Sequence, residues 1–333
     1  MNKTVLTNEN SIGILRSVMM GLFSAVLFMT FFFTIFAPYP VAITSVLHGR
    51  LRAAIVLVVS MFAVYFLVAP GTEEFLLISL YIIFGGGTLV MASFGLSEVV
   101  RREIGPIKGI LLVAGFITSV NTIGLVGYAG MSGRTIESTI TQSIEQMQPW
   151  FKKNIEDMKQ AGQDNVFEFE AIFTQPELLI NKLIEHGPGT YVEFLLLMLW
   201  VNLFLLLKGN RLIKTKNNCK YNEMDLMNFK MPEPFVWVVI ASLLLALLGS
   251  YLKVMGLTIL GMTALKGLGV FYFFQGFSIY ISFLNYMKVT GFIRTFLIVL
   301  TVFSAWPILV CIGLADMFID FNKLMVKKDR GDL

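Results

Sequence analysis

The stretch GILRSVMMGLFSAVLFMTFFFTIF, residues Gly13 to Phe36, decides the class of fold. It contains a single charged side chain, Arg16. At about 1.5 Å per residue, a helix of this length crosses the roughly 30 Å hydrocarbon core of a bilayer. The run is too long for the apolar part of a cleavable signal peptide, and Ala37–Pro40 (APYP) follows it in place of a cleavage site. We therefore expect a retained membrane span.

Apolar runs of this kind recur along the 333 residues, of which 56% are hydrophobic and 14% charged, with a mean hydropathy of +0.74. These runs lack the alternation of a membrane β-strand, and helices satisfy their own backbone hydrogen bonds in lipid. The sequence predicts an all-α polytopic integral membrane protein, a helical bundle of about eight full spans plus two short membrane segments. The full spans are expected at 13–36, 53–69, 75–97, 107–128, 190–207, 234–252, 268–287 and 294–315.

The two short segments, 41–48 and 254–266, are each expected either as a short buried span or as a re-entrant segment. Whether each segment crosses the membrane decides on which side the chain ends lie. Basic residues near the ends favour the cytoplasmic side. Placing both ends of the chain inside requires both segments to cross, which gives ten membrane segments.

One long hydrophilic stretch, Gly130 to Gly189, interrupts the apolar runs. It carries nine acidic against five basic side chains, whereas the rest of the chain carries 13 acidic against 21 basic. This asymmetry places the stretch outside and the basic loops on the cytoplasmic side of the membrane. The basic loops nearest to spans contain Arg50 and Arg52; Arg101, Arg102 and Lys108; and Lys208, Arg211, Lys214, Lys216 and Lys220.

The acidic stretch is expected to form an amphipathic helical insert that divides the chain into parts 1–129, 130–189 and 190–333. Its apolar residues follow a helical stripe. Thr174 and Glu177 form a candidate capping box for a helix from Pro176 to His186, which Gly187-Pro188-Gly189 is expected to end. The insert is interpreted as a lid on the outer face, with partner docking or gating as the alternative. The stripe consists of Ile136, Ile140, Ile144, Met147, Phe151, Ile155 and Met158.

Motifs of enzymes and metal sites are absent from the sequence, which has no P-loop, His-Glu-x-x-His, Gly-x-Ser-x-Gly or Cys-x-x-Cys. Cys219 and Cys311 are badly placed for a disulfide and far from any metal-ligand spacing. We expect no enzymatic activity, no cofactor and no metal. The basic excess is explained by positive loops, so no nucleic-acid partner is expected.

Polar side chains inside apolar runs are the candidate binding residues, because burying them in lipid is costly. Tyr272, Gln275 and Tyr280 fall on one helical face and are expected to line one wall of a solute pocket, with Asn121 as a further candidate. The alternative for Gln275 and Asn121 is a helix–helix hydrogen bond worth about 1 kcal/mol. Asp316 is expected to pair with Arg294 or a lysine, or to lie at the interface near Asp320.

Ser17, Gly21 and Ala25 form a small-residue ladder on the first helix. Such ladders let two helices approach closely. The ladder is interpreted either as internal packing or as a docking face for a separate membrane subunit.

Several strings together resemble the uncharacterised YybS-like family of bacterial membrane proteins, over most of the chain. The resemblance ends where a basic residue is expected after Asp320-Phe321 and Asn322 stands instead. The strings are Pro188 before a run with Asn202 and Leu205-Leu206-Leu207-Lys208, Phe229-Lys230-Met231-Pro232, Phe273-Phe274-Gln275-Gly276, and Gly313-Leu314-Ala315-Asp316 leading to Asp320-Phe321.

That family is in turn similar to the substrate-binding S components of energy-coupling-factor transporters. The ladder Gly21-Leu22-Phe23-Ser24-Ala25 resembles the motif by which S components dock on their coupling subunit, and Pro40–His48 before Gly49 resembles another S-component feature. The resemblance implies a protein that binds or helps to transport a small solute without its own ATPase. Its partners would be the lipid bilayer, a small-molecule solute and a membrane coupling subunit. The alternative is a non-transporting scaffold that recruits an envelope protein.

Overall fold

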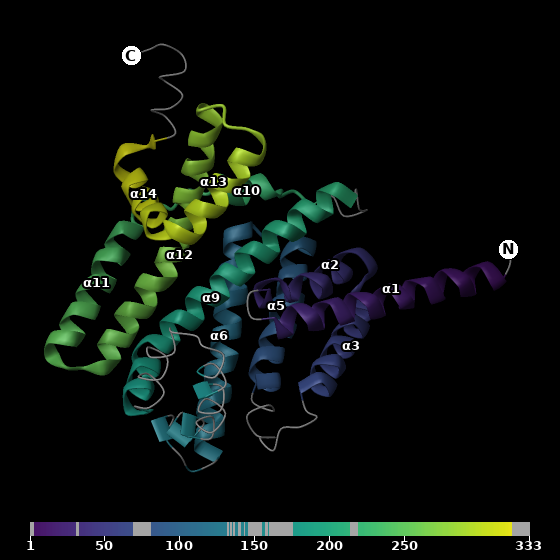
Figure 1. Cartoon of the computed structure of the whole chain (residues 1–333), viewed down its shortest axis with the longest axis horizontal. Helices are drawn as coiled ribbons and strands as arrows, with labels where there is room; N and C mark the ends of the chain where they lie inside the picture. Colours follow the sequence, from purple (N-terminus) through teal and green to yellow (C-terminus); the bar gives the residue numbers. More distant parts are fainter. Residues whose placement is uncertain are drawn as a thin grey trace. The chain divides into compact units, whose positions relative to one another are not determined.

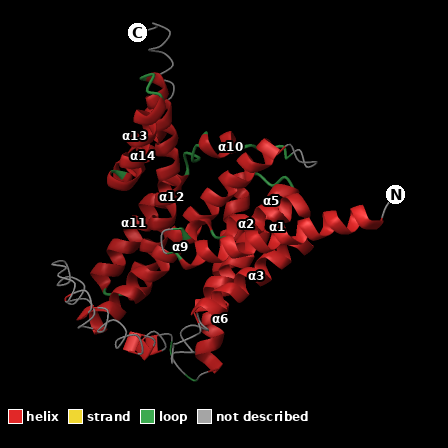
Figure 2. Ribbon diagram, turned by 45° about the vertical axis from the view of Figure 1, so that its right-hand side comes forward, coloured by secondary structure: helices red, strands yellow, loops and turns green. Residues whose placement is uncertain are grey.

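The computed structural model describes residues 3–30, 33–68, 81–131, isolated positions from 133 to 159, 176–213 and 219–321. Every regular element in these ranges is helical (Figures 1 and 2), which confirms the all-α class. The chain divides into two compact units. The first unit is Met1–Pro188 with Met198–Lys220, and the second is Gly189–Leu197 with Tyr221–Leu333.

The first unit is built around a short helix, α2, which contacts α1, α3 and α5. Eight of its 11 residues are buried. At about 1.5 Å per residue, α2 is only about 16 Å long, so it is a buried helix and too short to cross a bilayer. The elements of this unit are α1 (Lys3–Met29), η1 (Thr34–Phe36), α2 (Pro38–His48), α3 (Arg50–Val68), the π-helical turn η2 (Tyr81–Gly86), α5 (Gly87–Arg101), α6 (Pro106–Met131) and α9 (Pro176–Ile213) except for its residues 189–197.

Polar side chains from three helices donate to backbone carbonyls at the break between α1 and α2, which lie in η1, at Ala37 and at the first residue of α2. All three donors are buried. An unpaired carbonyl in an apolar interior is costly, so these side chains explain why the chain tolerates a break here. The bonds are Ser24 Oγ to Ala37 O (2.8 Å), Ser93 Oγ to Pro38 O (3.2 Å) and Asn202 Nδ2 to Ile35 O (2.6 Å).

Helix α9 runs unbroken through Gly187-Pro188-Gly189, so the prediction that a helix ends there is wrong. Pro188 removes only one backbone hydrogen bond from the helix. Ending the helix would leave up to four carbonyls and four N–H groups without partners, inside a segment, Ile180–Gly209, apolar enough to cross a membrane. Of the predicted stripe on the acidic stretch, Ile144 and Ile155 are described and buried. The other stripe residues and Thr174 lie outside the described residues.

The second unit starts from a hairpin of two antiparallel helices, α11 and α12. The turn between them uses Lys253 in the left-handed region (φ 56°). Two glycines allow the helices to touch: a Cβ on Gly249 would lie 2.4 Å from Thr258 N, and one on Gly261 would lie 2.4 Å from Ala246 N. The elements of this unit are α10 (Glu223–Met227), α11 (Phe235–Leu252), α12 (Met255–Tyr286), α13 (Gly291–Ser304) and α14 (Trp306–Ile319), with the α9 residues 189–197.

Helices α12 and α14 are in backbone contact at a pair of glycines. A Cβ on Gly276 would lie 1.8 Å from Leu309 O, and a Cβ on Gly313 would lie 2.0 Å from Tyr272 O. No side chain larger than hydrogen fits at either position without moving a helix, so this crossing requires both glycines.

The prediction of about eight full spans is not supported. Within the described residues, four helices are long and apolar enough to cross a membrane, and a fifth span is counted if α13 and α14 form one bent span. The expected segments 254–266 and 268–287 are one helix, α12, and the expected span 294–315 is broken by a 92° bend between α13 and α14. The four helices are Pro106–Met131, Ile180–Gly209, Phe235–Leu252 and Met255–Tyr286.

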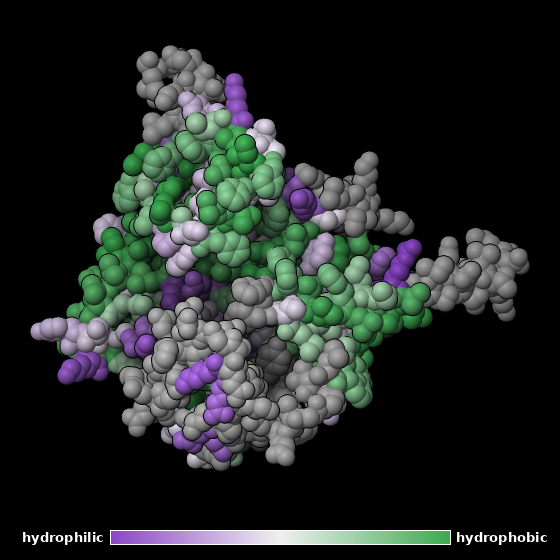
Figure 3. Space-filling model, in the orientation of Figure 1, coloured by the Kyte–Doolittle hydropathy of each residue, from purple (hydrophilic) through white to green (hydrophobic). Residues whose placement is uncertain are grey.

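Large hydrophobic side chains cover the outside of α11 and α13, and Figure 3 shows broad hydrophobic surface on the helices of the second unit. Trp237 and Tyr251 on α11 are 70% and 85% exposed, and Phe292 on α13 is 83% exposed. Contiguous apolar surface of this extent is what a lipid-facing helix presents.

We predict that Gly276→Leu destabilises the second unit strongly, because its side chain would occupy the space of the α14 backbone. Overpacking of this kind costs about 1–3 kcal/mol or more. Gly269→Leu is the control, because nothing lies within 4 Å of a Cβ at Gly269 on the same helix. The thermal unfolding midpoint of the purified protein in detergent measures both, and equal midpoints for the two variants would contradict the crossing.

Candidate functional site

A group of polar side chains lies where α14 crosses α12 and defines the candidate site. We call Lys230, Gln275, Asp316 and Asp320 the Asp316 cluster. The Asp316 side chain is 3% exposed and Gln275 is 1% exposed. A carboxylate and an amide buried among apolar helices are costly unless they are paired, and they mark functional positions in membrane proteins.

Three hydrogen bonds hold the buried part of the cluster. Gln275 Nε2 donates to Asp316 Oδ2 at 2.9 Å, and the backbone N–H of Met231 donates to Gln275 Oε1 at 3.0 Å. The backbone N–H of Phe321 donates to Asp316 Oδ1 at 2.9 Å. Gln275 thus connects the loop before α11 to the carboxylate on α14.

Lys230 supplies the positive charge. Its Nζ lies 3.7 Å from Asp316 Oδ2 and 3.4 Å from Asp320 Oδ2. Both separations are longer than a direct hydrogen bond of about 2.7–3.2 Å, so the lysine bridges two carboxylates through an ion pair alone. Its side chain is 46% exposed, whereas that of Asp316 is 3% exposed. The ammonium group is therefore more accessible than the Asp316 carboxylate, and the cluster contains two acidic side chains and one basic side chain.

Local backbone geometry brings these side chains together. The glycine contact between Gly276 and α14 places Gln275 beside the helix that carries Asp316. Asp320 caps α14 in the left-handed region (φ 48°), and its N–H donates to the carbonyl of Asp316. This turn directs the N–H of Phe321 back to the Asp316 carboxylate.

The three residues predicted to line one pocket wall separate into two groups. Tyr272 and Gln275 face α14: the Tyr272 hydroxyl donates to Met317 Sδ at 3.1 Å. Tyr280 instead faces α13, where its hydroxyl donates to the carbonyl of Leu297 at 3.2 Å. The predicted solute role of these three residues stays a prediction, and each has a partner within the protein.

Asn121, the fourth candidate, belongs to the first unit. Its Nδ2 donates to Thr88 Oγ1 at 2.9 Å, which links α6 to α5. This is the helix–helix hydrogen bond considered for it as the alternative to solute binding.

The predicted docking ladder is buried within the first unit. Ser17 is 3% exposed and Ala25 is 1% exposed. A Cβ on Gly21 would lie 2.7 Å from Val56 O, so this face of α1 packs on α3. A separate subunit would reach the ladder only if α3 moved away, and docking through it stays a prediction.

The sequence leaves two positions open for Asp316: it pairs with Arg294 or a lysine, or it lies at the interface near Asp320. The structure selects the lysine, Lys230, and places Asp320 on the same ammonium. This contact cannot be read from the sequence, because Lys230 lies in a loop before α11 and Asp316 lies much further along the chain, on α14. Among the described residues, no group of three or more His, Cys, Asp or Glu side chains is arranged to hold a metal ion.

Several helices that are long and apolar enough to cross a membrane, with large exposed hydrophobic side chains, indicate an integral membrane protein with several spans. The chain matches the family described as "Predicted membrane protein (DUF2232)" over residues 14–317, and it belongs to that family. No curated protein and no solved structure matches the chain.

We predict that Gln275→Leu lowers stability by about 2–3 kcal/mol, because it leaves the buried Met231 N–H without its acceptor and removes the hydrogen bond to Asp316 Oδ2. Asn285→Leu on the same helix is the control, since Asn285 is exposed. Thermal unfolding in detergent compares the two variants. A midpoint for Gln275→Leu at or above that of the control would show that the hydrogen bonds of Gln275 contribute nothing to stability.

Proposed function

We propose that the protein binds a small solute at the Asp316 cluster and acts in transport across a bacterial cytoplasmic membrane, without an ATPase of its own. One observation carries the proposal: an internal ammonium, Lys230, is held loosely between Asp316 and Asp320 at the exposed edge of a buried carboxylate. A buried carboxylate on an apolar helix, as Asp316 is on α14, is associated with substrate and ion pathways.

The charge of the cluster indicates the class of solute. Two carboxylates face one lysine, and that lysine contributes no direct hydrogen bond to either of them. A solute with a primary amine or another small cationic group has the same chemistry as the lysine side chain and gains shorter hydrogen bonds in its place. Lys230 is therefore an internal competitor that leaves when the solute binds.

The resemblance to S components adds a fold-level reason to expect solute binding coupled to a separate subunit, and fold alone does not assign function. We propose a membrane coupling subunit as the partner on these grounds. The basic loops and the acidic stretch 130–189 support an orientation with that stretch on the extracytoplasmic side.

The solute proposal predicts opposite effects for two variants. Asp316→Asn abolishes the stabilisation of the purified protein by amine-bearing solutes, whereas Lys230→Met increases it because the competitor is gone. The measurement is the shift in thermal unfolding midpoint across a panel of amino acids, polyamines and matched carboxylic acids. Lys253→Met, a lysine in the turn after α11, is the control and leaves the shifts unchanged.

No shift with any amine in the wild-type protein or in Lys230→Met would contradict the proposal. The scaffold alternative would then be supported if native mass spectrometry of the gently solubilised protein found an envelope protein bound and no small molecule. A loss of stability in Lys230→Met without any ligand effect would assign the cluster a structural role only.

The orientation is tested with single cysteines in a background that lacks Cys219 and Cys311. A cysteine at Glu145, an exposed position of the acidic stretch, is expected to react with a membrane-impermeant maleimide on intact cells or spheroplasts. A cysteine at Lys220, in a basic loop, is expected to react only after lysis. The reverse pattern would overturn the orientation.

A further inference from the structure

Five arginines gather at one end of the first unit, and we call Arg16, Arg50, Arg52, Arg101 and Arg102 the arginine end. Arg50 is the first residue of α3 and Arg52 lies in its first turn, while Arg101 is the last residue of α5 and Arg102 caps it. These helix ends meet around α2, which contacts both α3 and α5.

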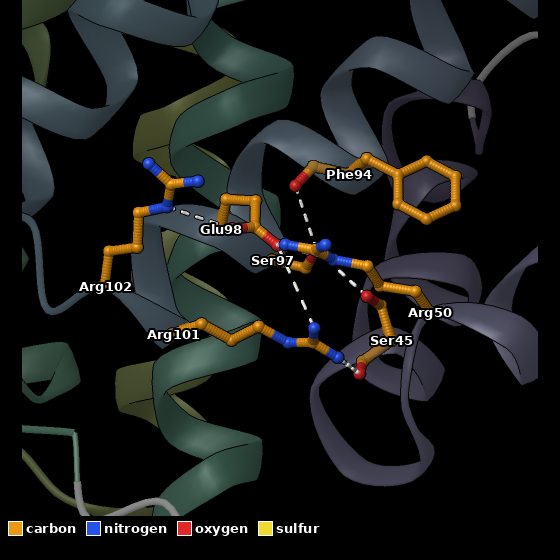
Figure 4. Close-up of polar contacts among 7 residues, drawn as sticks. All are labelled: Ser45, Arg50, Phe94, Ser97, Glu98, Arg101 and Arg102. Atoms are coloured by element: carbon orange, nitrogen blue, oxygen red, sulfur yellow. Dashed lines mark hydrogen bonds and ion pairs between the residues drawn. The ribbon is translucent and has the colours of Figure 1, made fainter.

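One carboxylate, Glu98, lies among three of these arginines (Figure 4). Arg50 donates to Glu98 Oε1 through Nε (3.1 Å) and Nη2 (2.6 Å), and Arg102 Nε donates to Oε2 at 3.1 Å. Arg101 Nη1 lies 3.8 Å from Oε1. Burial raises the pKa of Glu98, but the hydrogen bonds and charges of Arg50 and Arg102 outweigh it and hold the pKa below its ordinary value. Glu98 therefore neutralises one arginine at neutral pH and no more.

Buried contacts fix the end of α5, which carries Arg101 and Arg102, against α2. Ser45 Oγ donates to Ser97 Oγ at 3.0 Å, both residues are fully buried, and the bond joins α2 to α5. Arg101 donates to the backbone carbonyl of Ser45, next to this pair (Figure 4). The end of α5 that carries Arg101 and Arg102 is thus held against α2, which lowers the entropy cost of binding an anion there.

Arg16 and Arg52 are close to each other without a described carboxylate partner. A Cβ on Gly13 would lie 3.2 Å from Arg52 Nη2, so Arg52 lies across α1 one turn before Arg16. Burial and the charges of Arg52 and Arg16 lower the pKa of His48, which places His48 near both arginines. Among the described side chains, neither arginine forms an ion pair. Two like charges held together in this way favour an anion between them.

Exposed apolar residues adjoin the arginines and indicate what kind of anion fits. Leu51, between Arg50 and Arg52, is 80% exposed, and Leu15, next to Arg16, is 63% exposed. Helix α6, a candidate membrane span, begins at Pro106, shortly after Arg102. Positive charge at the end of a span, continuous with exposed apolar side chains, matches a phosphate head group followed by acyl chains.

We propose that the arginine end binds the phosphate of an anionic phospholipid, with Arg16 and Arg52 as the pair that holds it and Arg50 and Arg102 beside them. Guanidinium groups recognise phosphate through paired hydrogen bonds, and basic residues next to a membrane span bind acidic lipids. The side chains of Arg50 and Arg102 are 63% and 70% exposed, so their remaining N–H groups are accessible to head groups. This proposal does not depend on the solute site.

The test uses the full-length protein reconstituted in an equal mixture of phosphatidylglycerol and phosphatidylcholine. Native mass spectrometry after gentle extraction measures which lipid each protein molecule retains. The wild-type protein is expected to retain phosphatidylglycerol selectively. The double variant Arg16→Gln/Arg52→Gln is expected to lose about fivefold in this preference per arginine, or ~25-fold in total, from the typical contribution of one basic residue at a membrane surface.

The control is Lys288→Gln/Arg294→Gln in the second unit, where Lys288 follows α12 and Arg294 lies in the first turn of α13. It is expected to keep the wild-type preference. Equal retention of phosphatidylglycerol by the wild type and Arg16→Gln/Arg52→Gln would overturn the proposal, as would an equal loss in the control. If Arg16→Gln/Arg52→Gln unfolds, the proposal is tested by the lipid preference of the wild-type protein alone. Its preference must then fall as salt rises, because a charge-based site is screened.

A third measurement separates the lipid from free phosphate. Inorganic phosphate added to the protein in zwitterionic detergent is expected to raise the unfolding midpoint less than phosphatidylglycerol does at the same concentration. A rise with phosphate and none with the lipid would assign the arginine end to a soluble anion and would overturn the lipid site.

Discussion

The direct contact between the backbones of α12 and α14 at Gly276 and Gly313 is the constraint on which the second unit depends. Close approach removes the space for side chains and places neighbouring polar groups within hydrogen-bonding distance. Gln275, one residue before Gly276, then reaches Asp316 on the opposite helix. A wider crossing would break the hydrogen bond between the buried amide and the buried carboxylate, so packing and polar pairing at this point depend on each other.

Polar pairing is also required in the first unit, where carbonyls at the break between α1 and α2 lie within an apolar interior. Ser24 and Asn202 come from different helices and donate to the carbonyls of this break. Polar residues that look isolated within apolar runs are thus explained by the hydrogen bonds that they donate to irregular backbone elsewhere in the chain. In both units a polar side chain inside the protein replaces the water that a soluble protein would use.

Composition and apolar run length were enough to predict a helical membrane protein, because both act along a single stretch of chain. The number of spans was not predictable in this way. Pro188 and Gly267 look like helix breakers, yet α9 and α12 continue through them, because ending a helix in apolar surroundings costs more than one lost hydrogen bond. At Ala305 the opposite occurs, and an apolar run is bent by 92° between α13 and α14.

Gln275 and Asp316 could each be selected from the sequence as candidate residues, since a polar group within an apolar run is unusual wherever the run folds. Their pairing with each other and with Lys230 is a property of the tertiary structure, because 41 residues separate Gln275 from Asp316 and no local pattern records the contact. The small-residue ladder of α1 shows the same division. The spacing of Ser17, Gly21 and Ala25 indicates a close contact with another helix, whereas only the tertiary structure determines that this helix is α3.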